Sequence, residues 1–434
     1  MIDIQFIRDN PEEVTKKSAQ KGYPVDAKLI LELDAARKQQ LSTVEELRAK
    51  RNEISGRMKG GKPSDDDIAE GKQVKLELAE REEYLRSAEE ALTLELKKVP
   101  NMPLADVPVG STEEENVIAK TWGDKPQFDF TPKNHWQIAE ERDLIDKDRA
   151  AKIAGSRFAY IKGPLVQLQF AIMQWVTNTL ADESVIQKLI DENGLKISAK
   201  PFTPILPPAM IRTDAYEAMD RLQPSDDRYK VGADEDDLWL QGSAEHTLGS
   251  MYWNETLPEQ LFPIRYIGFL TSFRREAGTY GKDTEGIIRM HQFDKLEMEV
   301  FSTAETGLDE HRLLVAIQEY LVQQLNLPYQ LLQKCTFDIG KPNARGIDIE
   351  VWMPGQNKYR ETHTADYMTD YQSRRLNTRV KKSDGTVGLV HTNDATAFAL
   401  GRIMVAIIEN FQTADGHIKV PLVLQPYLNS KELL

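Results

Sequence analysis

The sequence predicts an α+β protein with two domains, an N-terminal antiparallel helical hairpin and a larger domain that contains β-strands. Two observations predict this division. Apolar residues between residues 27 and 99 recur at spacings of three and four, which is typical of amphipathic helices. Residues 288–300 instead alternate between apolar and mostly charged side chains, as in a strand whose two faces differ. A proline-rich stretch ends at residue 110, so we expect domains of 1–110 and 111–434.

The composition narrows the class of protein. The chain has 434 residues, of which 40% are hydrophobic and 29% charged, enough for a large buried core. It lacks an apolar run of the roughly 20 residues that a membrane span needs, and its first residues lack the features of a signal peptide. The single cysteine, Cys335, excludes an internal disulfide and a cysteine-rich zinc site. We therefore expect a cytoplasmic protein without membrane contact and without zinc.

Two long helices are predicted before the proline-rich stretch. Residues 1–26 should form a short helix and a connector, and the first long helix covers about residues 27–58. A break with glycine and proline at residues 59–67 separates it from the second helix, which ends near Val99. Because the apolar seam is narrow, the hairpin should stand in solvent. A spacer or dimerisation coiled coil and an RNA-binding arm both fit this pattern.

The charge distribution keeps the RNA-binding interpretation open. The net charge of -14 argues against a nucleic-acid partner. Residues 37–62, however, hold eight Lys or Arg against three Asp or Glu, so one stripe is basic enough to touch a phosphate backbone. The basic side chains expected to make such contacts are Arg37, Lys38, Arg48, Arg51 and Arg57.

The larger domain is predicted to mix short strands and helices. The expected elements are a hairpin near residue 158, a buried helix over 165–182, a strand within 200–212 that ends on Pro208, an apolar strand from Leu238 to just before Ser243, a strand pair over 337–361 that ends at Glu361, and a small-residue turn at 391–401 that leads into a helix.

The stretch from Phe273 to Val300 carries the main chemical signal. The alternate positions that carry charged residues place acidic and basic side chains on one face of the strand, with Phe293 among them. Such a platform suits a ligand that carries both a phosphate and an amine. The alternative is an antiparallel hairpin with one solvated face, although a solvated strand gains little from Phe293.

These residues resemble a known family. Residues 273–300 resemble motif 2 of class II aminoacyl-tRNA synthetases, with F-R-x-E, a loop, and R-x-H-Q-F-x-K-x-E. The sequence of the second part is most similar to that of the seryl-tRNA synthetases. Residues 200–212 resemble motif 1, residues 391–411 resemble motif 3, and the hairpin and linker resemble the tRNA-binding arm of that family. The resemblance implies a class II catalytic domain, an antiparallel sheet flanked by helices, and a homodimer formed through motif 1.

The resemblance also implies a reaction and its partners. L-serine would be activated with ATP and Mg²⁺ to seryl-adenylate and then transferred to the 3′ end of tRNA(Ser), whose long variable arm would contact the hairpin. The residues implied to bind ATP are Arg274, Arg275, Glu276, Phe293, Glu361, Thr362, His363, Thr364 and Arg402. Those implied to bind serine are Ser243, Ala244, Glu245, Arg274, Glu297, Asp394 and Thr396, and those implied to hold Mg²⁺ are Glu361 and Thr364.

The sequence departs from the family pattern within these motifs. Ser243 replaces threonine, and Asp394 replaces asparagine. Residues 361–366 read Glu-Thr-His-Thr-Ala-Asp where seryl enzymes usually have Glu-x-Ser-Ser-Cys-Ser. Glu285 and Lys282 change the motif 2 loop. A helix capping box remains the alternative explanation of Ser243 with its nearby glutamate.

Other functions stay open on the same resemblance. The chain could be a secondary or resistance copy with altered serine binding, a homologue that loads a carrier protein, or a non-catalytic RNA-binding paralogue. The long arm argues against carrier loading, and the retained charged residues argue against a non-catalytic role; these are Arg274, Glu276, Glu361 and Arg402.

Overall fold

The computed structural model describes residues 1–59, 64–232, 236–277 and 285–434. The chain forms two compact units, Met1–Met102 and Pro103–Leu434. Most of the predicted motif 2 loop, including Lys282, lies outside the described residues. Within the described ranges, no helix is long and apolar enough to span a membrane.

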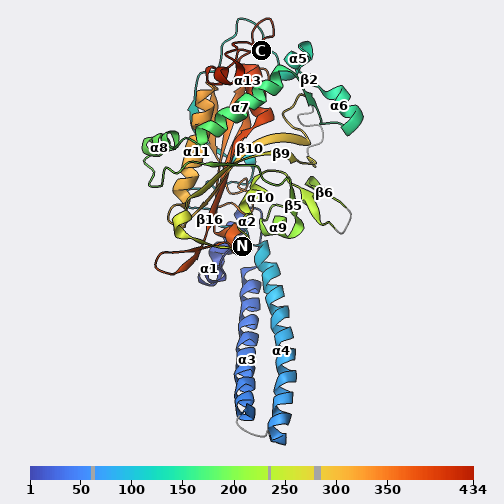
Figure 1. Cartoon of the computed structure of the whole chain (residues 1–434), viewed down its shortest axis with the longest axis vertical. Coiled ribbons are helices and arrows are strands. Elements are labelled where there is room, and N and C mark those ends of the chain that lie inside the picture. The colour runs from blue at the N-terminus through green and yellow to red at the C-terminus, as the bar shows by residue number, and fades with distance from the viewer. Residues whose placement is uncertain (60–63, 233–235, 278–284) are drawn as a thin grey trace. The chain divides into compact units, whose positions relative to one another are not determined.

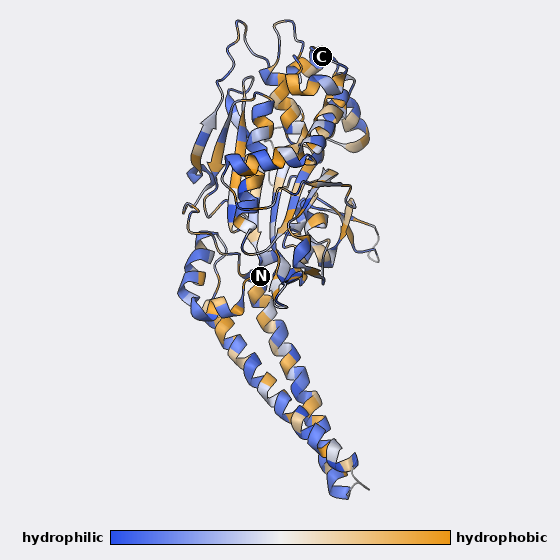
Figure 2. Ribbon diagram, turned by 60° about the vertical axis from the view of Figure 1, so that its left-hand side comes forward, coloured by the Kyte–Doolittle hydropathy of each residue, from blue (hydrophilic) through white to orange (hydrophobic). Residues whose placement is uncertain are grey.

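The first unit is helical throughout. Its helices are α1 (Ile4–Asp9), α2 (Pro11–Gln20), α3 (Ala27–Lys59) and α4 (Asp65–Lys98). The long helices α3 and α4 lie side by side and run in opposite directions (Figure 1), so the predicted hairpin is confirmed. They are joined by one apolar seam, formed by Val44, Leu47, Ile54, Val74, Leu78 and Leu85. Hydrophilic residues predominate outside that seam (Figure 2).

The start of α4 is fixed by a side-chain cap. The hydroxyl of Ser64 accepts a hydrogen bond from the backbone N–H of Asp67 at 3.0 Å and so caps the helix. Three aspartates, Asp65, Asp66 and Asp67, occupy the first turn, where the helix dipole favours negative charge.

The second unit is built on one eight-stranded sheet. Neighbouring strands are antiparallel except for β4 and β9, which are parallel. In spatial order the strands are β1 (Val117–Trp122), β11 (Tyr329–Gln333), β12 (Arg345–Met353), β13 (Lys358–Thr369), β16 (His391–Ala399), β10 (Gln292–Ser302), β9 (Ile264–Phe273) and β4 (Thr203–Ile205).

Smaller elements surround this sheet. The helices are α5 (His135–Glu141), α6 (Lys147–Ala154), α7 (Pro164–Leu180), α8 (Glu183–Glu192), α9 (Thr213–Ala218), α10 (Glu245–Gly249), α11 (Gly307–Gln324), α12 (Tyr371–Leu376) and α13 (Leu400–Asn410). The small sheets contain β2 (Ile145–Asp146) with β3 (Tyr160–Ile161), β5 (Met210–Arg212) with β7 (Leu238–Leu240) and β6 (Tyr229–Val231), and β8 (Thr256–Pro258) with β14 (Arg379–Lys381) and β15 (Val387–Leu389).

The two faces of the large sheet differ in chemistry. On β10, Leu296, Met298 and Val300 belong to the main apolar core, which also includes residues of α7, α11 and α13. The intervening Lys295 and Glu297 point to the opposite face, because alternate residues of a strand do so. They are nevertheless buried, at 6% and 1% exposure. The alternative of a hairpin with one solvated face is therefore wrong, since the charged face is covered.

Several predicted elements need correction. Residues 288–291 precede β10 and are not part of the strand. The segment 200–212 holds two short strands of different sheets, β4 and β5, because consecutive prolines at 207 and 208 interrupt the ladder. Residues 391–399 form the central strand β16 instead of a turn. Their small side chains let α11 pack closely on that strand.

Candidate active site

One cavity on the polar face of the sheet brings together side chains from distant parts of the sequence. Its volume is about 680 Å³, including the part that is open to solvent. The lining residues are Arg274, Glu276, Ile287, Ile288, Arg289, Met290, Phe293, Lys295, Glu361, Thr362, Thr364, Thr396, Ala399, Gly401 and Arg402. The two arginines of motifs 2 and 3, Arg274 and Arg402, thus face the same space.

Arg274 follows directly after β9 and is fixed by the backbone around it. Its Nε donates to the carbonyl of Gly242 at 3.0 Å, and its own N–H donates to the carbonyl of His291 at 2.9 Å. Its guanidinium lies 5.3 Å from the centre of the Phe293 ring. The cation and the aromatic ring therefore form one wall, with a charged and an apolar surface side by side.

Arg402 enters the cavity from the first turn of α13. Its Nη1 donates to the carbonyl of Glu361 at 2.9 Å and lies 3.0 Å from Oε1 of the same residue. The preceding Gly401 leaves little room, because a Cβ there would lie 3.1 Å from the carbonyl oxygen of Ile287. The helix start adds positive potential to that of the guanidinium.

The remaining motif 2 residues divide between the cavity and the surface. Glu276, with a φ of 55°, forms an ion pair with Arg289, and both line the cavity. Arg275 is exposed and lines no part of it. Its Nε donates to the carbonyl of Arg228 at 2.9 Å, and its guanidinium lies 4.7 Å from the centre of the Tyr229 ring.

Strand β13 supplies oxygen atoms to the cavity. Glu361, Thr362 and Thr364 all line it, because a register shift opposite Ile349 and Glu350 lets adjacent residues reach the same space. The hydroxyl of Thr364 accepts from Nζ of Lys334 at 3.0 Å. Carboxylate and hydroxyl oxygens are ligands of hard cations such as Mg²⁺.

His363 is the exception on this strand. It does not line the cavity but lies in the core, with its ring centre 5.0 Å from that of Phe398 and its Nδ1 2.7 Å from the Thr362 hydroxyl. Burial lowers the pKa of His363 to about 3. The structure therefore does not support His363 as an ATP contact, since the alternation of the strand points it toward the helices.

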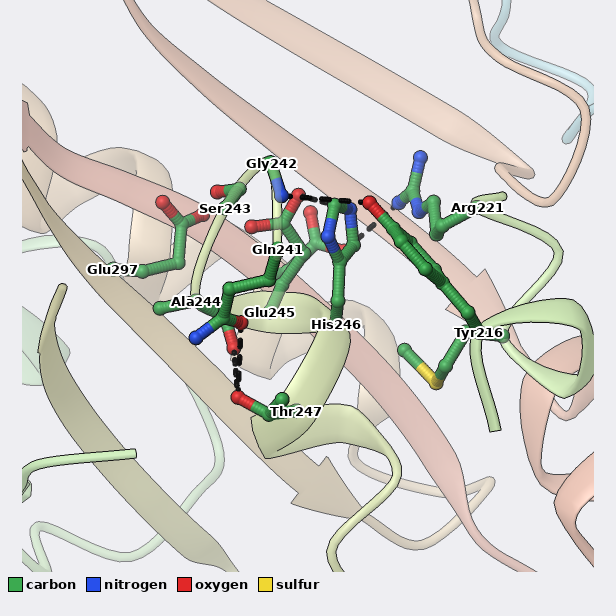
Figure 3. A network of polar contacts seen from close by, with 12 residues as sticks. Tyr216, Arg221, Gln241, Gly242, Ser243, Ala244, Glu245, His246, Thr247 and Glu297 are labelled. Atoms are coloured by element: carbon green, nitrogen blue, oxygen red, sulfur yellow. Dashed lines mark hydrogen bonds and ion pairs between the residues drawn. The ribbon is translucent and has the colours of Figure 1, made fainter. Parts of the chain in front are cut away.

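Three predicted serine-binding groups converge on one ammonium. Nζ of Lys295 lies 2.9 Å from Oγ of Ser243, 2.5 Å from Oε2 of Glu297 and 3.9 Å from Oε2 of Glu245. Figure 3 shows Ser243, Glu245 and Glu297 facing the same region. Ala244 occupies the N-cap position of α10, where no side-chain capping hydrogen bond is made, so Ser243 does not form a capping box.

Glu245 begins α10 and lies near several basic side chains. Burial alone would raise its pKa, but Lys295, His246 and Arg221 together hold the pKa of Glu245 below its usual value. The backbone N–H of Gly242 donates to the Tyr216 hydroxyl at 3.4 Å, which ties this loop to α9 (Figure 3).

Asp394 occupies the next row of the same sheet face. It pairs across the strands with Glu299 on β10 and Asp366 on β13, and its carboxylate accepts from Arg221 at 2.9 Å. Burial raises the pKa of Asp394 to about 7, against the effect of Arg221. Thr396, two residues along, lines the cavity opposite Glu297.

The structure shows charged residues to which the sequence assigned no role. Lys295 is two residues from both Phe293 and Glu297, so the alternation of the strand could have placed it on the same face. Arg221 lies in a loop outside the motifs, so no sequence pattern predicts its contact with Asp394. Asp366 pairs with Lys334 at 3.2 Å.

The predicted RNA-contacting side chains of the hairpin lie on α3. Arg37 and Lys38 pair with Asp34 at 3.1 and 3.4 Å. Arg48 pairs with Glu82 on α4 at 2.8 Å. The other two, Arg51 and Arg57, donate to Asn52 at 3.3 Å and to Glu70 at 2.6 Å.

Comparison with known proteins places this geometry in a family. Residues 1–103 match the family described as the seryl-tRNA synthetase N-terminal domain, and residues 229–411 match the tRNA synthetase class II core domain (G, H, P, S and T). A serine–tRNA ligase of Symbiobacterium thermophilum is 36% identical over 100% of both chains. The chain belongs to the serine–tRNA ligase family.

Other relatives agree with this placement. The serine–tRNA ligase of Petrotoga mobilis is 36% identical over 99% of each chain. The crystal structure of the Pyrococcus horikoshii seryl-tRNA synthetase with ATP has a TM-score of 0.87 at 34% identity and covers 100% of this chain and 99% of its own. The Naegleria fowleri enzyme with AMP, at 24% identity and a TM-score of 0.84 over 100% of this chain and 98% of its own, shares the fold.

Proposed function

We propose that this chain activates L-serine with ATP and transfers the seryl group to the 3′ end of tRNA(Ser). The observation that carries the proposal is the single cavity lined by Arg274, Phe293 and Arg402. A nucleoside triphosphate needs an apolar surface for its base and separated cations for its phosphates, and this cavity offers both.

The nucleotide would lie along this wall. Phe293 would stack on adenine, and Glu276 would accept a hydrogen bond from the adenine amino group. Arg274 would bind the α-phosphate, and Arg402 the γ-phosphate end. Both guanidiniums are held by backbone carbonyl groups, which positions them for the phosphates.

The donor set of β13 fits a magnesium ion. Glu361 and Thr364 would hold it, because Mg²⁺ typically takes one or two protein oxygens and completes its shell with phosphate and water. When bound, the ion neutralises charge on the phosphates. The expectation that no zinc is needed stays a prediction.

No side chain need act as a nucleophile. The serine carboxylate attacks the α-phosphate and pyrophosphate leaves, so the protein contributes positioning and charge stabilisation. Ser243, Glu245 and Glu297 would bind the serine ammonium, and Thr396 with Asp394 would contact the hydroxyl. An alanine substrate would leave these polar groups unpaired, which disfavours it.

The partners follow from exposed surfaces. The basic side chains of α3 would contact the long variable arm of tRNA(Ser). The edge strand β4 precedes Leu206, which is 80% exposed, and β5 begins at Met210, which is 44% exposed. These apolar side chains support a homodimer through motif 1. We also propose a cytoplasmic location, because the chain belongs to the serine–tRNA ligase family.

The direct test is ATP–pyrophosphate exchange with purified protein and serine, threonine or alanine in parallel. Exchange should require serine and Mg²⁺ and be far weaker with the other two. The enzymatic proposal is wrong if none of the three supports exchange. Charging of tRNA(Ser) in the same preparation tests the transfer step.

A further inference from the structure

The ammonium of Lys295 occupies an unusual position. It lies 2.9 Å from Ser243, 2.5 Å from Glu297 and 3.9 Å from Glu245, the three groups to which the proposed function assigns the ammonium of the amino acid. The side chain of Lys295 is 8% exposed and those of Glu297 and Glu245 are 1% and 10% exposed. A buried cation therefore fills this place.

Two ammonium groups cannot share these partners. A lysine ammonium and the α-ammonium of an amino acid each carry three N–H donors and one positive charge. Placed together among the same acceptors, they would repel each other at a short distance in a poorly hydrated site. Binding of the amino acid therefore requires Lys295 to leave.

The structure offers a place for the displaced ammonium. Lys295 also lines the nucleotide cavity, together with Arg274 and Glu361. Its backbone is fixed in the middle of the sheet, opposite Leu270 on β9 and Ala399 on β16. The four-carbon side chain can rotate without any movement of the strand.

We propose that Lys295 is an internal stand-in for the amino-acid ammonium, which the substrate displaces into the nucleotide cavity. The inference rests on the proposed function, because that function names the amino acid. The exchange keeps the charge of the Ser243–Glu245–Glu297 group constant. It also brings a cation beside the reacting carboxylate and α-phosphate only when the amino acid is bound, which makes Lys295 a positioning and specificity residue for the activation step.

The positive charge of Lys295 agrees with this role. Burial lowers the pKa of Lys295, but Glu297 and Glu245 reverse that effect, so the pKa lies above its usual value. Lys295 is therefore charged. The neighbouring charged groups that interact with it are Arg274, Glu245, Glu297 and Glu361.

The first test uses a small amine as a probe of the vacated place. In Lys295→Met, methylammonium should raise the melting temperature, because it can donate to Glu297 and Ser243. Tetramethylammonium, which has no N–H group, should not. Wild-type protein should respond to neither. Equal shifts in the variant and in wild type would overturn the proposal.

The second test measures affinity for L-serinamide, which carries the ammonium but cannot react. Lys295→Met should bind it about tenfold more tightly than wild type, and Lys295→Arg more weakly, since a guanidinium holds a carboxylate bidentately and leaves less easily. The order Met, Lys, Arg contradicts a purely structural role, for which lysine would bind best. The proposal is overturned if wild type binds L-serinamide more tightly than Lys295→Met. If Lys295→Met does not fold, the comparison is between wild type and Lys295→Arg, and binding by the arginine variant that is as tight as or tighter than that of wild type overturns the proposal.

A matched control separates this effect from loss of a buried charge. Arg265 lies 2.8 Å from Glu310, with side chains 0% and 1% exposed, and is a buried cation away from the predicted serine contacts. Arg265→Met should leave the affinity for L-serinamide unchanged, and an equal gain there would overturn the proposal. If wild type catalyses no serine-dependent exchange but methylammonium still stabilises Lys295→Met, the proposed function fails and the internal ammonium remains.

Discussion

The helical arm and the large sheet both carry many ion pairs, but they expose them differently. In the arm, Arg48 and Glu82 lie 2.8 Å apart with side chains 49% and 42% exposed. On the sheet, Arg265 and Glu310 lie 2.8 Å apart with side chains 0% and 1% exposed. Exposed pairs contribute at most about 1 kcal/mol, whereas a buried partner left alone is strongly destabilising.

The difference separates two uses of charge. A cation of the arm can exchange its carboxylate for a phosphate group without loss of the fold. A cation of the sheet has lost most of its water before any ligand binds and holds its position. The arm is therefore suited to a large, charged partner, and the sheet to precise binding of a small one.

Removal of one buried partner should give the largest effect. Arg265→Met leaves the carboxylate of Glu310 buried without its cation, and we expect a loss of about 3–5 kcal/mol in the free energy of unfolding. Urea denaturation measures it. The double variant with Glu310→Met should recover most of the loss. A single-variant loss below about 1 kcal/mol would erase the distinction from the exposed pairs of the arm.

A cavity cation should affect activity more than stability. Arg402→Ala should lower kcat/KM for pyrophosphate exchange about 10²–10³-fold, the usual effect of removing one positioned donor to developing charge. The control is Arg312→Ala on α11, whose guanidinium pairs with Asp309 at 2.9 Å on the surface. Equal losses in both variants would contradict a specific role for Arg402.

Titration of a buried group should give a smaller effect. The pKa of His363 is lowered to about 3 by burial, from an ordinary value of 6.5. Below pH 6.5 the imidazole of His363 is protonated in the unfolded chain but stays neutral in the folded chain. The free energy of unfolding therefore falls as the pH decreases toward 3. At pH 5 this amounts to about 2 kcal/mol.

The variant His363→Leu removes that titration. Its stability should fall by about 2 kcal/mol less than that of wild type between pH 8 and pH 5, as measured by urea denaturation at each pH. At pH 8 both forms have a neutral residue there, so that measurement isolates the packing change. An unchanged pH dependence would mean that His363 takes up its proton in the folded protein.

The smallest effect on stability should come from the arm. Arg48→Ala should change the free energy of unfolding by less than about 1 kcal/mol and leave pyrophosphate exchange intact. Charging of tRNA(Ser) should weaken several-fold, and its salt dependence should decrease by about one phosphate contact. The control is Arg86→Ala on α4, which pairs with Glu83 at 2.6 Å. Equal charging by the two variants would argue against a tRNA contact at Arg48.

The sequence predicted the parts of this protein that follow a simple period. The seam of the hairpin and the shared face of Phe293 and Glu297 both follow from spacing alone. The position of His363 outside the cavity could not be predicted, because the sequence does not show the register shift in β13 that brings both Glu361 and Thr362 to the cavity. Strand β16 was taken for a turn because its alanines and threonines have no apolar alternation, although neighbouring strands on both sides pair with it.

The charged contacts of the sheet were harder to predict than its elements. The pairing of Arg221 with Asp394 joins a loop to a strand far away in the sequence, and no local pattern marks either partner. Lys295 was visible as part of a motif, but its position between two carboxylates depends on the placement of α10. The domain boundary at residue 110 and the individual site residues stay predictions.

The central claim is that cations from distant motifs act on one nucleotide over the polar face of the sheet. A crystal structure with an unreactive seryl-adenylate analogue tests it most directly. The account predicts the phosphate beside Arg274, the adenine ring on Phe293, and the ammonium of Lys295 moved away from Glu297. An analogue bound outside the cavity that Arg274 and Arg402 share would contradict it.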